Sequence, residues 1–172
     1  MMCSAVNAQG NSIPPFLIFP RVYFKDQMIK NAPVGTVGAA HSSGWMTSET
    51  FGLWLQHFIK HSRCCKENQV LLLMNNHDSH VSIAVIDKAK ENGIVLLTFP
   101  PHCSHKLQPL DRSVFGPLKR YYNDAANSWL ISNPGKTITI YDIADPGSSL
   151  SKGFHSREHN KWFQSCRNIS IQ

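Results

Sequence analysis

The stretch that decides the fold is 69–111, QVLLLMNNHDSHVSIAVIDKAKENGIVLLTFPPHCSHKLQPLD. It holds two short, uninterrupted apolar runs, 70–74 and 94–99, as expected for strands of a parallel sheet that is covered on both faces. Between them, 82–91 has the pattern of a helix, and Asn92-Gly93 supplies its left-handed stop. The stretch therefore predicts a strand–helix–strand unit of an α/β fold, with a right-handed crossover.

The residues before this unit predict a hairpin followed by a loop. Two apolar runs within 2–19 flank a turn at Gly10. Pro14 and Pro15 lack the N–H that a sheet ladder uses, so we expect part of the second run at a sheet edge or a bulge. Residues 20–44 carry no hydrophobic period, which predicts a surface loop with at most one short helix.

Two amphipathic helices are predicted on either side of the strand–helix–strand unit. Thr47 or Ser48 can cap the first helix. Its buried face is formed by Phe51, Trp54, Leu55, Phe58 and Ile59. The second helix holds Pro117 in its first turn, where a missing N–H costs little. Its apolar stripe is formed by Val114, Leu118, Tyr121, Tyr122, Ala125 and Trp129. Farther on, only the alternation in 137–141 hints at structure.

Composition bounds the class of protein. The chain has 172 residues with 42% hydrophobic content, enough for one domain with a core. Lys and Arg number 17 against 11 Asp and Glu, and the net charge of +6 favours an anionic partner. The five cysteines lack disulfide-scaffold spacing and no signal peptide precedes them, so we expect a soluble protein of the nucleus or cytoplasm. No nucleotide-binding glycine loop, serine-hydrolase elbow or His-Glu-x-x-His motif is present.

The opening stretch resembles the DDE-type superfamily endonuclease domain of pogo/Tigger/jerky-like transposases. In that family an apolar strand runs into an Asp-Asn pair and then Ser-His, and Pro-Pro-His-x-Ser-His-x-Leu-Gln-Pro-Leu-Asp follows. Here the first string reads NNHDSH at 75–80 and the second reads PPHCSHKLQPLD at 100–111. Segments 2–19, 44–58 and 114–119 continue the likeness.

The resemblance implies a ribonuclease H-like fold, in which a mixed sheet is flanked by helices. The likeness fades after Asp142, so we expect a partial endonuclease domain over 1–142 and a basic tail over 143–172 that can be disordered. The first catalytic Asp of the family falls on a strand before residue 1. We therefore expect the first central strand of the sheet to be lacking.

Cleavage in this family would use Mg²⁺ ions held by carboxylates. The resemblance places the second of three carboxylates at position 75, which is Asn75, and the third at Asp111. An amide oxygen carries no formal charge, so we expect no tightly bound Mg²⁺ and no catalysis, with Asp111 a weak ligand at most. Asp78 could substitute only if its loop rearranged. Taken alone, Asp111 also has a structural interpretation, because a carboxylate is favourable near a helix N-terminus.

The histidines offer a second kind of chemistry. His77 and His80 form one short pair, and His102, Cys103 and His105 form another group. Nitrogen and sulfur ligands of this kind can hold Zn²⁺ when four of them meet in a tetrahedron. A zinc-stabilised interaction module is therefore an alternative. In the resembling family both groups belong to the Ser-His and Pro-Pro-His-x-Ser-His strings, whose histidines order loops or approach DNA phosphate.

Nucleic-acid contact depends less on carboxylates than cleavage does. Lys106, Arg112, Lys119 and Arg120 cluster around the turn at 107–110 and the start of the second helix, and could pair with phosphates. Such contacts would be independent of sequence, because no base-reading module is visible. The resemblance adds two further candidates for phosphate contact, His80 and His105.

The prediction is therefore a transposase-derived domain that binds DNA or another nucleic acid without cutting it. Two rivals stay open beside the zinc module. The chain could be a fragment of an active Mg²⁺-dependent nuclease, against which Asn75 argues. It could also be a degenerate product that neither binds nor cleaves, because a missing central strand leaves its neighbours without hydrogen-bonding partners.

Overall fold

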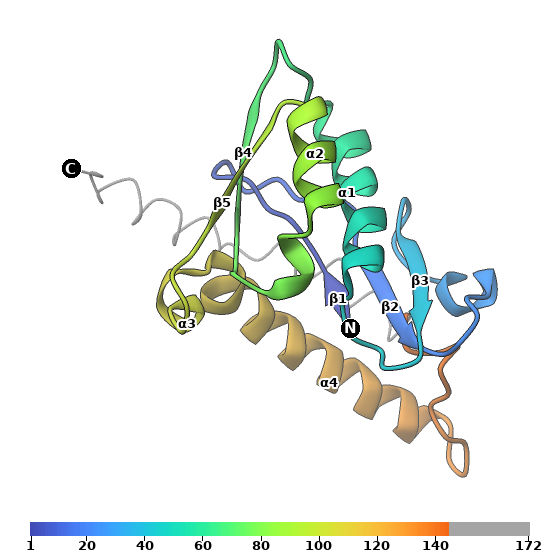
Figure 1. Ribbon diagram of the computed structural model, residues 1–172. Helices are drawn as coiled ribbons and strands as arrows, with labels where there is room; N and C mark the ends of the chain where they lie inside the picture. Colours follow the sequence, from blue (N-terminus) through green and yellow to red (C-terminus); the bar gives the residue numbers. More distant parts are fainter. Residues whose placement is uncertain (145–172) are drawn as a thin grey trace.

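The predicted strand–helix–strand unit is present in the computed structural model, which describes residues 1–144 (Figure 1). Its elements are β4 (Val70–Met74), the 3₁₀ helix η2 (Asp78–His80), α2 (Ile83–Glu91) and β5 (Ile94–Thr98). β4 and β5 pair in parallel from Val70 opposite Ile94 to Met74 opposite Thr98. Gly93 turns the chain from α2 into β5 with a φ of 70°. The prediction from 69–111 is confirmed in its elements and their order.

A second sheet contains three strands in the order β1-β2-β3. Their bounds are β1 (Met2–Cys3), β2 (Phe16–Pro20) and β3 (Val37–His41). β1 and β2 are antiparallel, which confirms the hairpin. β3 lies parallel to β2, so 20–44 holds a strand as well as the short helix η1 (Asp26–Ile29), and the prediction of a loop there is wrong. β3 is short and made mainly of small residues, and its pairing is non-local, so no period marks it in the sequence.

β2 occupies the middle of this sheet rather than its edge. The two prolines precede the strand, so their missing N–H groups cost no ladder hydrogen bond. Phe16 is completely buried and Ile18 is nearly so. The expectation of an edge or bulge is therefore wrong for residues 16–20, because the apolar run after Pro15 supplies a central strand whose first four residues are buried.

One face of both sheets is covered by α1 (Ser48–Ser62) and α2 (Figure 1). Thr47 caps α1 by accepting a hydrogen bond from the Thr50 N–H, and Thr50 reciprocates, a capping box. The predicted face of α1 is buried, except that Ile59 is only partly so. His57 is buried too, and its Nε2 lies 2.8 Å from the Pro14 carbonyl oxygen, which ties α1 to the start of β2. The sequence pattern did not indicate this histidine.

The opposite face is covered only in part among the described residues. Behind β2, a small cluster is formed by Leu17, Phe19, Met28 and Ala144. On the β4–β5 sheet, the alternate side chains Leu71, Leu73, Val95 and Leu97 are 45–57% exposed. The expectation that these two strands are covered on both faces is therefore wrong within residues 1–144. An uninterrupted apolar run predicts a strand but not what covers each face.

Within residues 1–144, β1 and β4 each pair with a strand on one side only. The structure therefore has two small sheets where the resemblance implies one mixed sheet. It is a mixed α/β fold that is compatible with a truncated ribonuclease H-like fold. The alternation at 137–141 forms no strand, and the chain there passes through turns that bring Ala144 to the small cluster.

The second predicted helix is present as the π-helix η3 (Leu110–Val114) followed directly by α4 (Phe115–Ser132). A further short helix, α3 (Ser104–Leu107), lies in the segment before it, where the sequence predicted no helix. Val114 and Leu118 are buried, but Tyr121 is 42% exposed and the rest of the predicted stripe is only half-buried. In Figure 1, α4 runs past the ends of the strands instead of packing along a sheet. None of the helices in the described part of the chain is long and apolar enough to cross a membrane.

The turn into β5 generates a stability prediction. Gly93→Ala places a β-carbon at a φ of 70° and against the Cys65 carbonyl group, so it should lower the free energy of unfolding by about 2–4 kcal/mol. The matched control is Gly52→Ala within α1, where an added β-carbon meets no heavy atom within 4 Å apart from its chain neighbours and the backbone of its own helix. That change should stabilise by about 0.5–1 kcal/mol. Urea unfolding followed by circular dichroism checks both, and equal effects would contradict this account of the turn.

The contact between η2 and α1 generates a prediction about pH. The His80 ring packs on Phe51 with 4.2 Å between ring centroids, and its Nδ1 is buried without a hydrogen-bond partner. Burial, and then the charge of His77, lowers the pKa of His80 to about 4. An unfolded histidine has a pKa of about 6.5, so the unfolded chain binds more protons between these values. Stability should be full above pH 6.5 and should fall as the pH drops toward 4.

The variant His80→Phe keeps a ring on Phe51 but cannot take up a proton. Between pH 7.5 and 4 it should lose about 1–3 kcal/mol less unfolding free energy than the parent. The difference in unfolding free energy between parent and variant at pH 7.5 serves as the baseline, because the imidazole of the parent and the phenyl ring of the variant are both uncharged at that pH. Identical pH profiles would show that His80 is not the group responsible.

Candidate functional site

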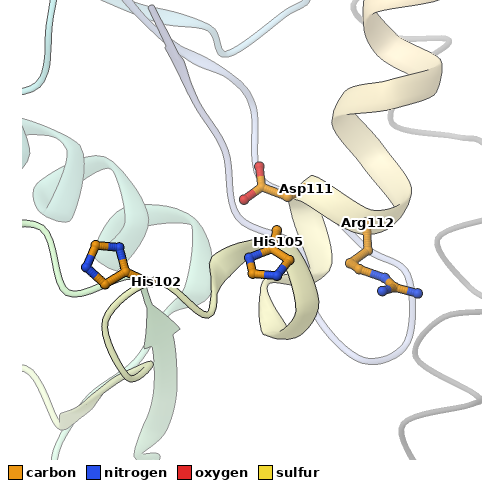
Figure 2. A pocket seen from close by; sticks show the side chains of 4 residues that line it. All are labelled: His102, His105, Asp111 and Arg112. Atoms are coloured by element: carbon orange, nitrogen blue, oxygen red, sulfur yellow. The ribbon is translucent and has the colours of Figure 1, made fainter.

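An open pocket of about 670 Å³ lies where the chain leaves β5 and enters the helices (Figure 2). Its lining side chains are His102, His105, Asp111 and Arg112. They come from the loop after β5, from α3 and from η3, so one continuous segment builds the site. All four side chains are exposed to solvent.

Local backbone hydrogen bonds position this segment. The Phe99 N–H donates to the Met74 carbonyl oxygen at 2.9 Å, which fixes the start of the loop at the end of β4. His102 follows with a φ of 61°, a left-handed conformation that is uncommon for a residue other than glycine. The Phe115 N–H then donates to the Leu110 carbonyl oxygen, which makes η3 a π-helix. π-helical turns and left-handed residues concentrate at functional sites.

The electrostatics of the pocket centre on one carboxylate. Partial burial raises the pKa of Asp111, and the positive charge of Lys119 acts in the opposite direction. The adjacent Arg112 carries a second permanent charge. Asp111 is therefore a partly desolvated acid with cations nearby rather than one member of an acidic group.

The donor set does not fit the two-magnesium centre that the resemblance implies. The pocket lining contains a single carboxylate, and Asn75 is not part of it. Among residues 1–144, no three His, Cys, Asp or Glu side chains lie close enough together to hold a metal ion. Asp78 opens the 3₁₀ helix η2 and does not line this pocket either. Two divalent ions in this pocket would have Asp111 as their single carboxylate ligand, and the next residue, Arg112, is positively charged.

The two histidine groups also stay apart in the described part of the chain, so they do not make a tetrahedral zinc site. His77 is engaged locally, with its Nδ1 2.8 Å from the Ser79 Oγ. His80 packs on Phe51, with its ring centroid 5.5 Å from that of His77. His102 and His105 instead line the pocket beside Asp111.

The predicted phosphate-binding residues are only partly brought together. Arg112 and His105 line the pocket, and Lys119 lies close enough for its charge to act on Asp111. The side chains of Lys106, on α3, and Arg120, on α4, are exposed but do not line it. His80 does not line the pocket, and its ring, which packs at a tilt on Phe51 and has a pKa of about 4, is poorly suited to pairing with phosphate.

One pocket residue has a role that sequence reasoning missed. His102 entered only as a possible zinc ligand, whereas the structure makes it part of the pocket wall. The preceding Pro100-Pro101 turn was a visible signal for a constrained loop. The left-handed conformation that follows the turn cannot be read from the sequence, because few residues other than glycine adopt it.

Comparison with known proteins covers most of the chain. Two relatives are a protein named as the MFS-type transporter clz9 from Cochliobolus lunatus, 37% identical over 124 residues, and the human pogo transposable element with ZNF domain, 26% identical over 119 residues. The matches cover 71% and 68% of this chain. They cover only 14% and 8% of those proteins.

No solved structure gives a significant match. The family model described as DDE superfamily endonuclease matches residues 1–157, most of the chain. The family named there agrees with the strings at 75–80 and 100–111 and with the mixed α/β fold. The chain belongs to the DDE superfamily endonuclease family.

Proposed function

We propose that this domain associates with nucleic acid through phosphate contacts that do not depend on base sequence, and that it does not cleave its partner. The observation that carries the proposal is the charge balance around the pocket. One partly desolvated carboxylate, Asp111, stands among Arg112, Lys119 and two histidines. Cations beside a cavity favour phosphate, whereas metal-dependent cleavage needs several carboxylates in one place.

The contacts would be made by exposed side chains that α3, η3 and α4 present. Arg112 can offer two parallel N–H donors to one phosphate, and Lys106, Lys119 and Arg120 can each add a charge. The net charge of +6 supports association in the same direction. We place the domain in the nucleus, where its family and a DNA partner would put it.

We expect no cleavage because the described part of the domain lacks a set of carboxylate ligands for the metal ions. Replacing a carboxylate by the Asn75 amide removes a charged ligand, and one strong contact of about 3–4 kcal/mol corresponds to a rate loss of about a hundredfold to a thousandfold. Asn75 and Asp111 do not line one pocket. An active nuclease fragment is the competing function, and the tests below separate the two.

The binding half of the proposal predicts a defined salt dependence. The logarithm of the association constant for a DNA duplex should fall linearly with the logarithm of salt concentration, by about 0.9 per phosphate contact. Arg112→Ala should weaken binding and reduce the slope by about 1. Lys60→Ala removes the same charge from the exposed side of α1 and should leave the slope unchanged. Absence of any complex at low salt would refute the binding proposal and favour the degenerate product.

The inactivity half predicts the outcome of a plasmid-nicking assay. The parent protein should nick supercoiled DNA no faster than buffer in Mg²⁺ or Mn²⁺. Asn75→Asp should not restore nicking, because the added carboxylate does not join Asp111 in one pocket. Metal-dependent nicking by the parent that disappears in Asp111→Ala would establish the nuclease instead.

A further inference from the structure

We infer that residues 145–172 of this chain cover the open apolar face of the β4–β5 sheet. The side chains of this open face, two from each strand, are Leu71, Leu73, Val95 and Leu97. The inference makes the segment after Ala144 part of the packing of the domain, whereas its composition alone predicts a basic tail that can be disordered. It is independent of the proposed association with nucleic acid.

The open face is continuous across both strands. The register sets Leu71 opposite Val95 and Leu73 opposite Leu97, and neighbouring strands lie only about 4.8 Å apart. All four side chains are purely apolar, and they are 45–57% exposed within residues 1–144. Single exposed leucines are ordinary, but apolar side chains gathered in one patch are typical of a contact surface. The open face therefore needs a covering segment with apolar side chains of its own.

The described part of the chain ends on the side of the molecule to which this face points. On β2, Phe16 and Ile18 belong to the core that α1 shares with β4, whereas Leu17 and Phe19 belong to the small cluster behind the strand. Ala144 packs into that small cluster. The chain therefore leaves Ala144 on the side opposite to α1, and the open face of the β4–β5 sheet is also opposite to α1 (Figure 1).

The segment after Ala144 has the length and the side chains to close the open face. The family model matches the chain up to residue 157, so the domain of this family continues past Ala144. An extended chain spans about 3.3 Å per residue, so about ten residues reach beyond the width of about 24 Å that five adjacent strands have. The large apolar side chains that the segment holds among its polar residues include Leu150, Phe154, Trp162 and Phe163.

Hydrogen exchange followed by mass spectrometry tests the inference on the full chain. Amides within 145–172 should exchange at least tenfold more slowly, as an order of magnitude, than those of a free peptide with the same sequence. Leu71→Thr combined with Leu73→Thr keeps the strand propensity of β4 but makes the face polar, so this protection should be lost. Amides of α1 should stay protected, which shows that the variant is folded. Exchange of 145–172 at the free-peptide rate in the parent, or protection that survives the double variant, would overturn the inference.

The matched control is Leu53→Gln, which changes a leucine of α1 that is 46% exposed and lies outside the open face. A leucine of similar exposure is lost, but the covering of β4 and β5 is not touched. The protection of 145–172 should therefore equal that of the parent. Loss of this protection in Leu53→Gln would count against the open face as the contact surface.

A reciprocal variant changes the covering segment and leaves both strands intact, so it decides the question if the double variant of β4 does not fold. Phe154→Ser, Trp162→Ser and Phe163→Ser together remove aromatic side chains from 145–172. The open face should then become accessible to the dye ANS, which binds exposed apolar surface, and ANS fluorescence should rise above that of the parent. Fluorescence equal to that of the parent would contradict the inference.

Sedimentation of the full chain distinguishes its own covering segment from a second copy. If residues 145–172 cover the face of the same molecule, the parent and the double variant Leu71→Thr, Leu73→Thr should sediment with the same mass. A dimer in the parent that becomes a monomer in the double variant would show that another copy covers the open face, and it would overturn the inference.

Discussion

The parallel pairing of β4 with β5 is the constraint on which the site depends. Five residue pairs from Val70–Ile94 to Met74–Thr98 fix the register, and the hydrogen bond from Phe99 to Met74 carries the pairing one residue into the loop. The buried side chains of β4, Leu72 and Met74, belong to the same core cluster as α1. In that helix Phe51, Trp54 and Phe58 stack in succession. The loop that leaves β5 therefore starts at a fixed point, which in turn determines where its histidines and η3 lie.

At this position a family-like sequence string meets a local excess of positive charge. The segment carries a Pro-Pro-His-Cys-Ser-His string that resembles the family's, and His102, His105 and Asp111 line the pocket. Cations around Asp111 and the amide at Asn75 change what such a wall can attract. The electrostatic preference of a site depends on its summed charge and not on the fold that carries it.

The sequence predicts much of this structure where the signals are local. The apolar runs of β4 and β5, the Thr47 cap of α1 and the glycine stop after α2 each depend on neighbouring residues, and all are present. The sequence did not predict β3, because its small residues pair with β2, a strand that lies far away in the chain. It also did not predict that Leu71 and Leu73 are exposed, because the pattern of a strand does not show which elements cover its two faces. In the site, the resemblance named Asp111 and a cluster of basic residues named Arg112, and both line the pocket. The backbone of His102 and the tilted packing of His80 on Phe51 depend on the folded structure and cannot be read from the sequence.

The central claim is that phosphate is held by charge without a metal ion. It is tested most directly by the affinity for one DNA duplex, measured in EDTA and in Mg²⁺ at matched ionic strength. The account predicts an affinity that Mg²⁺ leaves unchanged or lowers, because the ion competes with Arg112 and Lys119 for phosphate. An affinity that rises with Mg²⁺, and loses that rise in Asp111→Asn, would contradict it.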